Sequence, residues 1–305
     1  MSDATDGTRR TVLVAGATGH QGGAVARALL DRGFAVRGLT RDPSQPAAGA
    51  LEERGAEMVR GDLYEPETVE PLVEDADGVF CVSDFWSQVY AVQMRQGTNL
   101  ARVSAEAGVD HFVLSGVAGS ERDTGIPHFE SCAEIEANVR EFGLPWTFLR
   151  PTFFMQNFEG FHGDITAGTL ALPIAEDTNH QMFDLTDIGP VAARVFDDPD
   201  RYVGRAFELA GDEGRLEDLA DVFGEVLGTD VEPFYLPIEQ AREAFGEESA
   251  AMCEWFVEEG FDADVEAMDE EFGGLTTLRE YLDREGWSRE KSDAAVVTSW
   301  LEAVA

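Results

Sequence analysis

Short runs of apolar residues alternate with longer amphipathic segments through the first half of the chain. Runs of four to six residues rich in Val, Leu and Phe, bounded by turn residues, are typical of buried parallel strands. The segments between them have the apolar spacing of helices, and strands that alternate with helices indicate an α/β fold. The predicted strands are 11–15, 35–40, 57–60, 78–82, 111–114 and 147–151, and the helices between them include 47–54, 65–73, 89–107 and one that ends near 141.

The second half of the chain has a different pattern. A helix at 186–196 and a strand at 204–209 continue the alternation, and beyond Gly211 the spacing becomes mostly helical. We therefore predict a doubly wound parallel sheet at 9–152 and a smaller, mainly helical α/β lobe at 153–305 that is interleaved with it. The elements predicted beyond Gly211 are helices at 216–226, 238–245, 250–258, 278–285 and 294–304 and one strand at 231–235.

The first predicted strand runs directly into a glycine-rich turn and a helix. Gly16, Gly19 and Gly22 have G-x-x-G-x-x-G spacing. In a dinucleotide site the first glycine permits the turn, the second admits the pyrophosphate, and the third lets the helix pack close to the sheet. The free N–H groups of the helix then face the phosphates. A glycine turn without a ligand is the alternative, but its place at the first strand-to-helix junction favours a Rossmann-type NAD(P) site.

The ends of the second and third strands carry the residues that would contact the rest of a dinucleotide. Arg41 follows the second strand, and its planar guanidinium suits the 2′-phosphate of NADP. Asp42 comes next and suits the ribose hydroxyl of NAD instead, so we expect NADP with NAD as the alternative. Asp62 follows the third strand, where it can contact the adenine end, cap the following helix, or do both.

Ser115 follows the fifth strand, where short-chain dehydrogenases commonly place a serine. In those enzymes a Tyr-x-x-x-Lys helix comes after it, and the lysine lowers the pKa of the catalytic tyrosine. None of the five tyrosines here has a lysine at the fourth following place, and Lys291 is the sole lysine of the chain. That catalytic pair cannot form.

The charge balance of the chain indicates an environment of high salt concentration. Asp and Glu number 60 against 22 Lys and Arg, the formal net charge is -38, and the acidic residues spread over the whole length. Such self-repulsion weakens a compact state at ordinary ionic strength, whereas molar salt shortens the Debye length to about 3 Å. We expect a halophilic protein. The same negative field repels a nucleic-acid backbone, which disfavours direct DNA binding.

Cysteine usage and the N-terminal segment favour a cytoplasmic location. Cys81, Cys132 and Cys253 are widely spaced and contain no C-x-x-C pair, so they indicate neither a disulfide framework nor a zinc site. The first eight residues are polar and acidic and lack the apolar core of a signal peptide. Since no apolar stretch is long enough to cross a bilayer, we expect a soluble cytoplasmic protein without a metal site.

Six segments form an ordered set of motifs. They are GATGHQGG at 16–23, TRDP at 40–43, GD at 61–62, SDFW at 83–86, TGIPHFES at 124–131 and LRPTFFMQNF at 149–158. Together they resemble the NmrA-like family, the branch of atypical short-chain dehydrogenases that includes the HSCARG redox sensors. The resemblance runs from about Thr11 to Leu282, which is nearly the whole chain.

The resemblance implies an NADP site made of these motifs. Relatives often have a second basic residue four places after the arginine, where this chain has Gln45, and a lysine after the TGIPHFES motif, where it has Cys132. The implied contacts are Gly16, Ala17, Thr18, Gly19, His20, Gln21 and Gly22 at the pyrophosphate; Arg41 at the 2′-phosphate; Asp62 and Leu63 near adenine; Ser83, Asp84 and Phe85 along the ribose; and Cys132, Phe154, Met155, Gln156 and Asn157 near the nicotinamide.

Three residues are weak catalytic candidates: Ser115, His128 and Cys132. A helix start can lower the pKa of the Cys132 thiol, whereas the glutamates around it raise that pKa, and a buried apolar role is the alternative. His128 can be a proton donor to a substrate or a packing residue of its loop.

The missing lysine favours a dinucleotide sensor with a regulatory protein partner over an enzyme. The alternative is an NAD(P)H-dependent reductase of a quinone or similar planar acceptor, since the cofactor carries that chemistry. Phe153, Phe154, Phe158 and Phe161 then either close over the nicotinamide or pack between the lobes. A structural protein that has lost its cofactor is a third alternative, and the intact glycine turn argues against it.

Overall fold

A seven-stranded parallel sheet forms the centre of the first lobe. The computed structural model describes residues 9–83 and 90–288. The strand order is β10-β6-β5-β4-β1-β2-β3, and every neighbouring pair is parallel. The order changes direction between β1 and β4, where a doubly wound sheet opens a crevice at its carboxyl edge. The strands are β1 (Thr11–Val14), β2 (Ala35–Thr40), β3 (Glu57–Arg60), β4 (Gly78–Cys81), β5 (His111–Ser115), β6 (Trp146–Pro151) and β10 (Arg205–Leu209).

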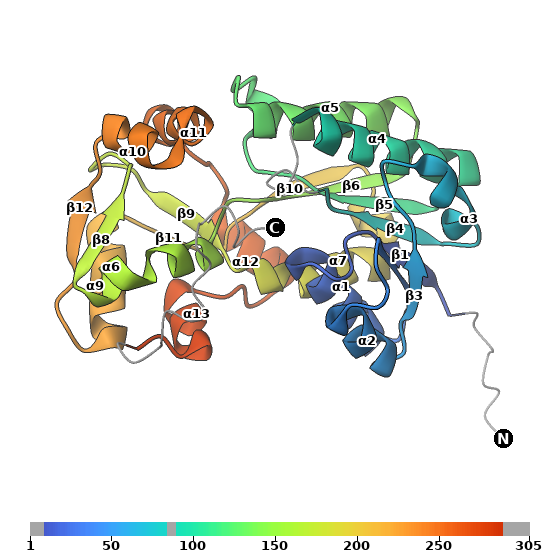
Figure 1. Cartoon of the computed structure of the whole chain (residues 1–305), viewed down its shortest axis with the longest axis horizontal. Coiled ribbons are helices and arrows are strands. Elements are labelled where there is room, and N and C mark those ends of the chain that lie inside the picture. The colour runs from blue at the N-terminus through green and yellow to red at the C-terminus, as the bar shows by residue number, and fades with distance from the viewer. Residues whose placement is uncertain (1–8, 84–89, 289–305) are drawn as a thin grey trace.

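Two helical layers cover the two faces of this sheet (Figure 1). Successive strand residues point to opposite faces, so Val12 and Val14 pack into one core while Leu13 packs into the other. One layer contains α1 (His20–Asp31), α2 (Pro46–Glu53) and α7 (Ile188–Asp197); the other contains α3 (Glu70–Val73), α4 (Tyr90–Ala107) and α5 (Pro127–Glu141). Helices α1 and α7 touch at Gly189, where a Cβ would lie 2.6 Å from the carbonyl oxygen of Ala24.

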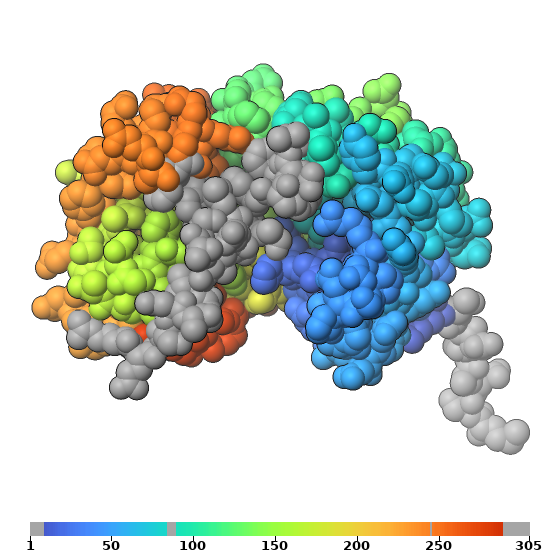
Figure 2. All heavy atoms as spheres, in the orientation of Figure 1, coloured from blue at the N-terminus to red at the C-terminus, as the bar shows by residue number. Residues whose placement is uncertain are grey.

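The second lobe combines two small sheets with helices, and Figure 2 shows it beside the first lobe. Its sheets have the orders β11-β9-β7 and β12-β8. Phe158, Phe223 and Tyr281 are fully buried in its core. Its elements are β7 (Phe153–Phe154), α6 (His162–Thr166), β8 (Thr169–Leu172), β9 (His180–Phe183), β11 (Asp212–Gly214), α9 (Leu216–Leu227), β12 (Glu232–Tyr235), α10 (Ile238–Phe245), α11 (Glu247–Glu258) and α13 (Leu278–Glu285). Helices α8 (Pro199–Tyr202) and α12 (Val265–Phe272) pack against the core of the first lobe through Tyr202 and Phe272.

The predicted fold class is confirmed, and several elements differ in detail. The helix predicted at 65–73 is a 3₁₀ turn, Pro66–Thr68, followed by the short α3, because Pro66 and Pro71 lack the amide N–H of a regular helix. The sequence did not predict β7, β8, β9 or β11, each of which has four residues or fewer. The helix predicted at 294–304 lies outside the described residues.

The chain returns to the first sheet after entering the second lobe. Strand β10 pairs in parallel with β6, and α7 packs on α1 against the same sheet. The two lobes are therefore joined by several chain crossings near the carboxyl edge. None of the helices in the described ranges has both the length and the apolar character that a bilayer crossing requires.

Candidate functional site

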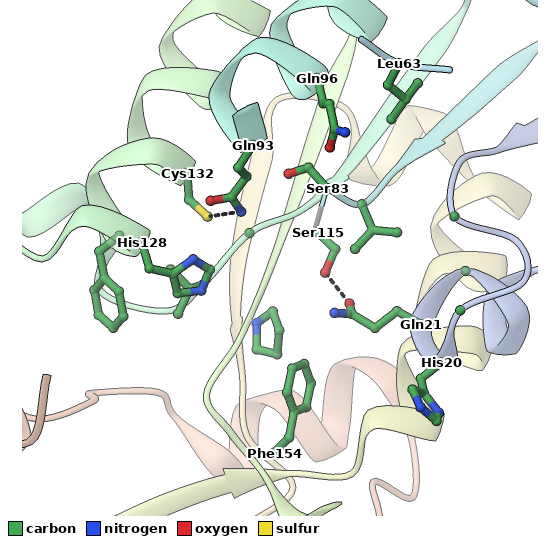
Figure 3. A pocket seen from close by; sticks show the side chains of 18 of the residues that line it. His20, Gln21, Leu63, Ser83, Gln93, Gln96, Ser115, His128, Cys132 and Phe154 are labelled. Atoms are coloured by element: carbon green, nitrogen blue, oxygen red, sulfur yellow. Dashed lines mark hydrogen bonds between the residues drawn. The ribbon is translucent and has the colours of Figure 1, made fainter. Parts of the chain in front are cut away.

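A cavity of about 310 Å³ follows the carboxyl edge of the large sheet. It extends from the glycine turn after β1, past the ends of β2 to β6, to side chains of the second lobe (Figure 3). Asp84 and Phe85, predicted at the ribose, lie outside the described residues. The predicted site residues that line the cavity are Gly16, Thr18, Gly19, His20, Gln21, Gly22, Arg41, Asp62, Leu63, Ser83, Ser115, His128, Cys132, Phe154 and Asn157.

Three predicted contacts do not line the cavity. Ala17 is buried beneath the turn in the core of the sheet. Met155 is fully buried in the core of the second lobe. The Gln156 amide donates to Asp184 Oδ1 at 2.9 Å and accepts from the Leu185 amide at 3.0 Å. The Met155 and Gln156 side chains hold the segment after β6 in place, and neither lines the cavity in which they were predicted to approach the nicotinamide.

The glycine turn leaves the amino end of α1 open to the cavity. Gly16 has φ +64°, and a Cβ at Gly22 would lie 2.2 Å from the Gly16 carbonyl oxygen, so both positions require glycine. Among the described residues no side chain caps α1, and its first turn holds no acidic residue. The unpaired N–H groups of that turn fit a phosphate group.

Arg41 and Asp42 have different roles in the structure. The Asp42 carboxylate accepts hydrogen bonds from the Ser44 hydroxyl at 2.6 Å and the Ser44 amide at 3.0 Å, and these bonds lower the Asp42 pKa. Arg41 is exposed, lines the cavity, and makes no hydrogen bond or ion pair with another described residue. Asp42, the acid that favours NAD, does not line the cavity, whereas Arg41 lines it and is available to an anionic ligand.

Asp62 also stabilises its own turn. Its Oδ1 accepts from the Tyr64 amide at 2.8 Å, while the residue lines the cavity beside Leu63. The turn-capping role is therefore present, and it leaves the second carboxylate oxygen available to a ligand.

Two hydrogen-bonded groups form the polar wall of the cavity, and Figure 3 draws the Ser115–Gln21 bond of one and the Gln93–Cys132 bond of the other. The Ser115 hydroxyl donates to Gln21 Oε1 at 2.7 Å, which fixes the amide of Gln21. On the other side, Gln93 of α4 accepts from the Ser131 hydroxyl and donates to the Cys132 sulfur at 3.8 Å. Gln93 is 2% exposed and was missed by the sequence analysis, although Gln93 and Gln96 lie one helical turn apart on α4 and both line the cavity.

Burial keeps the two central titratable side chains uncharged at neutral pH. It lowers the pKa of His128 to about 4. It also raises the pKa of the Cys132 thiol to about 12, and the nearby Glu136 carboxylate acts in the same direction. Of the possibilities left open for Cys132, the structure favours the buried, uncharged thiol over a thiolate, because desolvation outweighs the helix dipole. Neither residue is a charged group for catalysis at neutral pH.

The far end of the cavity is apolar, and its walls come from both lobes. We call this end the aromatic chamber; its residues are Val117, Phe129, Phe153, Phe154, Met252, Phe256 and Phe261. Of the four clustered phenylalanines in the sequence, Phe153 and Phe154 line the cavity, whereas Phe158 and Phe161 pack in the second lobe. Met252, Phe256 and Phe261 were missed, since nothing local links them to the cofactor motifs.

The family is identified by a match over most of the chain. The family model described as NmrA-like family matches residues 8–282. The chain belongs to the NmrA-like family. Among the described residues of this family member, no three potential metal ligands (His, Cys, Asp or Glu) cluster together.

The proteins to which this chain is similar in sequence or in fold include both enzymes and a regulator. The NAD(P)H azoreductase of Xenophilus azovorans is 31% identical over 235 residues, which is 76% of this chain and 79% of the relative. An NADPH-dependent quinone oxidoreductase of Escherichia coli, solved with NADPH, has a TM-score of 0.79 at 20% identity and covers 90% of this chain and 99% of its own. NmrA, a negative transcriptional regulator solved with NADP, has a TM-score of 0.76 at 19% identity and covers 92% of this chain and 96% of its own.

Proposed function

We propose that this chain binds NADP(H) and reduces a planar, largely apolar acceptor held in the aromatic chamber. One observation carries the proposal: a single continuous cavity joins the glycine turn and Arg41 to the aromatic chamber. A cofactor that lies along the sheet edge then presents its nicotinamide to the acceptor. The azoreductase and quinone oxidoreductase relatives support this class of acceptor.

The residues of the first lobe hold the cofactor in this proposal. The N–H groups at the start of α1 bind the pyrophosphate, and Arg41 binds the 2′-phosphate. Gln21, held by Ser115, directs its amide N–H groups into the cavity. When bound, NADPH supplies a hydride, and the protein aligns it with the acceptor.

The residues of the chamber select the acceptor. Aromatic rings stack favourably on a flat conjugated molecule and exclude water from the site of transfer. Because burial keeps His128 and Cys132 uncharged, neither supplies a fixed cation or a ready proton at neutral pH. We therefore infer an acceptor that takes a hydride without a protein acid and obtains its proton from water, such as a quinone or an azo compound.

A dinucleotide sensor is the second candidate, and Cys132 is the observation that favours it. This uncharged thiol stands where relatives place a lysine, and sensing requires no proton donor. NADPH, NADP or neither would then favour different arrangements of the loops at the sheet edge, which a regulatory protein partner would distinguish. The regulator among the structural relatives is consistent with this candidate.

The deciding experiment measures binding first and turnover second. NADPH is titrated into the protein in molar KCl, and its oxidation is then followed with a panel of quinones and azo dyes. Oxidation above the protein-free rate supports the reductase, whereas tight binding without oxidation overturns it in favour of the sensor.

A variant tests the chamber itself. Phe261→Ala removes a half-buried chamber ring and should lower kcat/KM for the acceptor about tenfold while leaving NADPH binding unchanged. Phe234→Ala is the matched control, because Phe234 is 46% exposed on β12, outside the cavity lining.

A further inference from the structure

A second, smaller cavity lies directly behind the aromatic chamber. Its volume is about 40 Å³, and it shares Phe153, Met252 and Phe256 with the chamber. These three side chains therefore have one surface toward each space. We call the smaller space the side pocket; Ile174, His180 and Cys253 line it without lining the larger cavity.

The side pocket is uncharged and almost wholly apolar. His180 carries the one conventional hydrogen-bonding side chain among its lining residues, and the ring is 4% exposed. Its Nε2 has no hydrogen-bond partner among the described residues, and burial lowers its pKa to about 4, so the ring is neutral at neutral pH. An apolar space of this kind favours hydrocarbon over water or ions, because a void leaves its lining without contacts that an apolar group restores.

Of the three side chains that separate the aromatic chamber from the side pocket, Met252 can move aside most readily. Met252 is unbranched, with three rotatable bonds, and adapts its shape to a neighbour more readily than the two phenylalanines beside it. The Phe153 ring is fixed on its far side by a contact with the His180 ring, with centroids 4.6 Å apart. A change of Met252 rotamer is therefore the simplest route from the chamber into the side pocket.

Resting on the proposed function, we propose that the side pocket binds a short, uncharged hydrocarbon substituent of the planar acceptor. The flat conjugated part would occupy the aromatic chamber, and the substituent would pass Met252. A cavity volume of about 10–15 Å³ is enough for one water-sized group. The side pocket, at about 40 Å³, therefore has room for about three such groups. The preferred substituent is accordingly a branch of about three carbons.

The test uses 1,4-naphthoquinones that carry hydrogen, methyl, ethyl, isopropyl or hexyl at carbon 2. Both kcat/KM with NADPH and the affinity of each quinone for the NADP-loaded protein should rise about fourfold per added carbon up to isopropyl. The hexyl compound should show no further gain, because the pocket is then full. A response to chain length that is flat, or that continues through hexyl, overturns the proposal.

Variants separate the contribution of the side pocket to this gain from the intrinsic reactivity and solubility of the quinones. Ile174→Phe fills the side pocket and should abolish the gain from isopropyl while leaving the unsubstituted quinone unaffected. Val257→Phe is the matched control, since Val257 is 39% exposed on α11 and lines neither space, and it should keep the full gain. An Ile174→Phe protein that keeps the gain also overturns the proposal. If that variant does not fold, Cys253→Leu fills the same pocket from α11.

Failure of the proposed function gives a different result. If no quinone is reduced, the reductase proposal fails, while equilibrium dialysis of the same series with the NADP-loaded protein still measures the pocket. A fourfold gain per carbon in binding then supports the side pocket, and a flat series overturns it.

Discussion

Replacing Arg41 with alanine should weaken NADPH binding and leave NADH binding nearly unchanged. Arg41 is exposed at the end of β2 and has no hydrogen-bond or ion-pair partner among the described residues. Its removal therefore leaves no other group unpaired. Asp42 does not line the cavity, so it is not placed to replace Arg41 by binding the ribose.

The size of the effect follows from the kind of contact that is lost. A hydrogen bond to a charged group contributes about 1.5–3 kcal/mol, and about 1.4 kcal/mol is a factor of ten in affinity. We expect the NADPH dissociation constant to rise about 10-fold to 150-fold, and that of NADH to change less than about threefold. The free energy of unfolding should change by less than about 0.5 kcal/mol, as for other exposed side chains.

The assay is titration of each reduced dinucleotide by its fluorescence in molar KCl, together with urea unfolding. Arg54→Ala is the control: Arg54 is also exposed, pairs with Asp31 at 2.6 Å, and lies outside the cavity lining. It should change neither affinity. Equal losses for NADPH and NADH in Arg41→Ala, or no loss at all, would refute the reasoning. The next candidate would then be Arg60, which pairs in register with Thr40 on the neighbouring strand.

Four further outcomes are expected. Gly22→Ala should abolish NADPH binding and lower the free energy of unfolding by about 1–3 kcal/mol, because the new Cβ would lie 2.2 Å from the Gly16 carbonyl oxygen. Gly49→Ala, whose new Cβ has no atom within 4 Å, should instead raise the free energy of unfolding by about 0.5–1 kcal/mol; urea unfolding measures both. Ser115→Ala should release the Gln21 amide and raise the NADPH dissociation constant about threefold to tenfold, with the stability of the fold monitored in parallel. Burial lowers the folded-state pKa of His111, His128 and His180 to about 4 from an ordinary value of about 6.5, so the stability they contribute is complete above pH 6.5 and is lost as the pH falls toward 4. Urea unfolding at pH 7 and pH 5 should show a loss of up to about 2 kcal/mol for each of the buried His111 and His180, and a smaller loss for the half-buried His128. Raising KCl from 0.1 M to 2 M should strengthen NADPH binding, measured by the same titration.

The parts of the fold that the sequence predicted depend on local patterns. The apolar runs of β1 to β6 and the three glycines after β1 are each contained within a few residues, and the parallel order follows from strands that alternate with helices. Residues at the ends of those strands then meet at one edge, which is why Arg41, Asp62 and Ser115, each predicted from its place after a strand, line the same cavity.

The parts that the sequence did not predict depend on distant contacts or on side-chain direction. Met252 and Phe256 join the chamber from α11, more than a hundred residues beyond the glycine turn, and an amphipathic helix alone does not reveal which surface it covers. The run Phe154-Met155-Gln156 follows directly after a strand, and it has no apolar periodicity that separates Phe154, which lines the cavity, from Met155 and Gln156, which do not. The hydrogen bond from the Ser44 amide to Asp42 was predictable from the sequence, because an aspartate in a turn often accepts a hydrogen bond from the backbone two residues further on.

The net charge of -38 opposes the binding of an anionic cofactor. The long-range field of the chain repels phosphate, and salt weakens that repulsion because the Debye length falls from about 10 Å at 0.1 M to about 3 Å at 1 M. The attraction acts at contact, through the N–H groups of α1 and through Arg41, and the first turn of α1 contains no acidic residue to oppose it. Salt should therefore remove more repulsion than attraction, so NADPH affinity should rise with KCl. A phosphate site in a basic protein responds in the opposite direction, since salt there screens the favourable term.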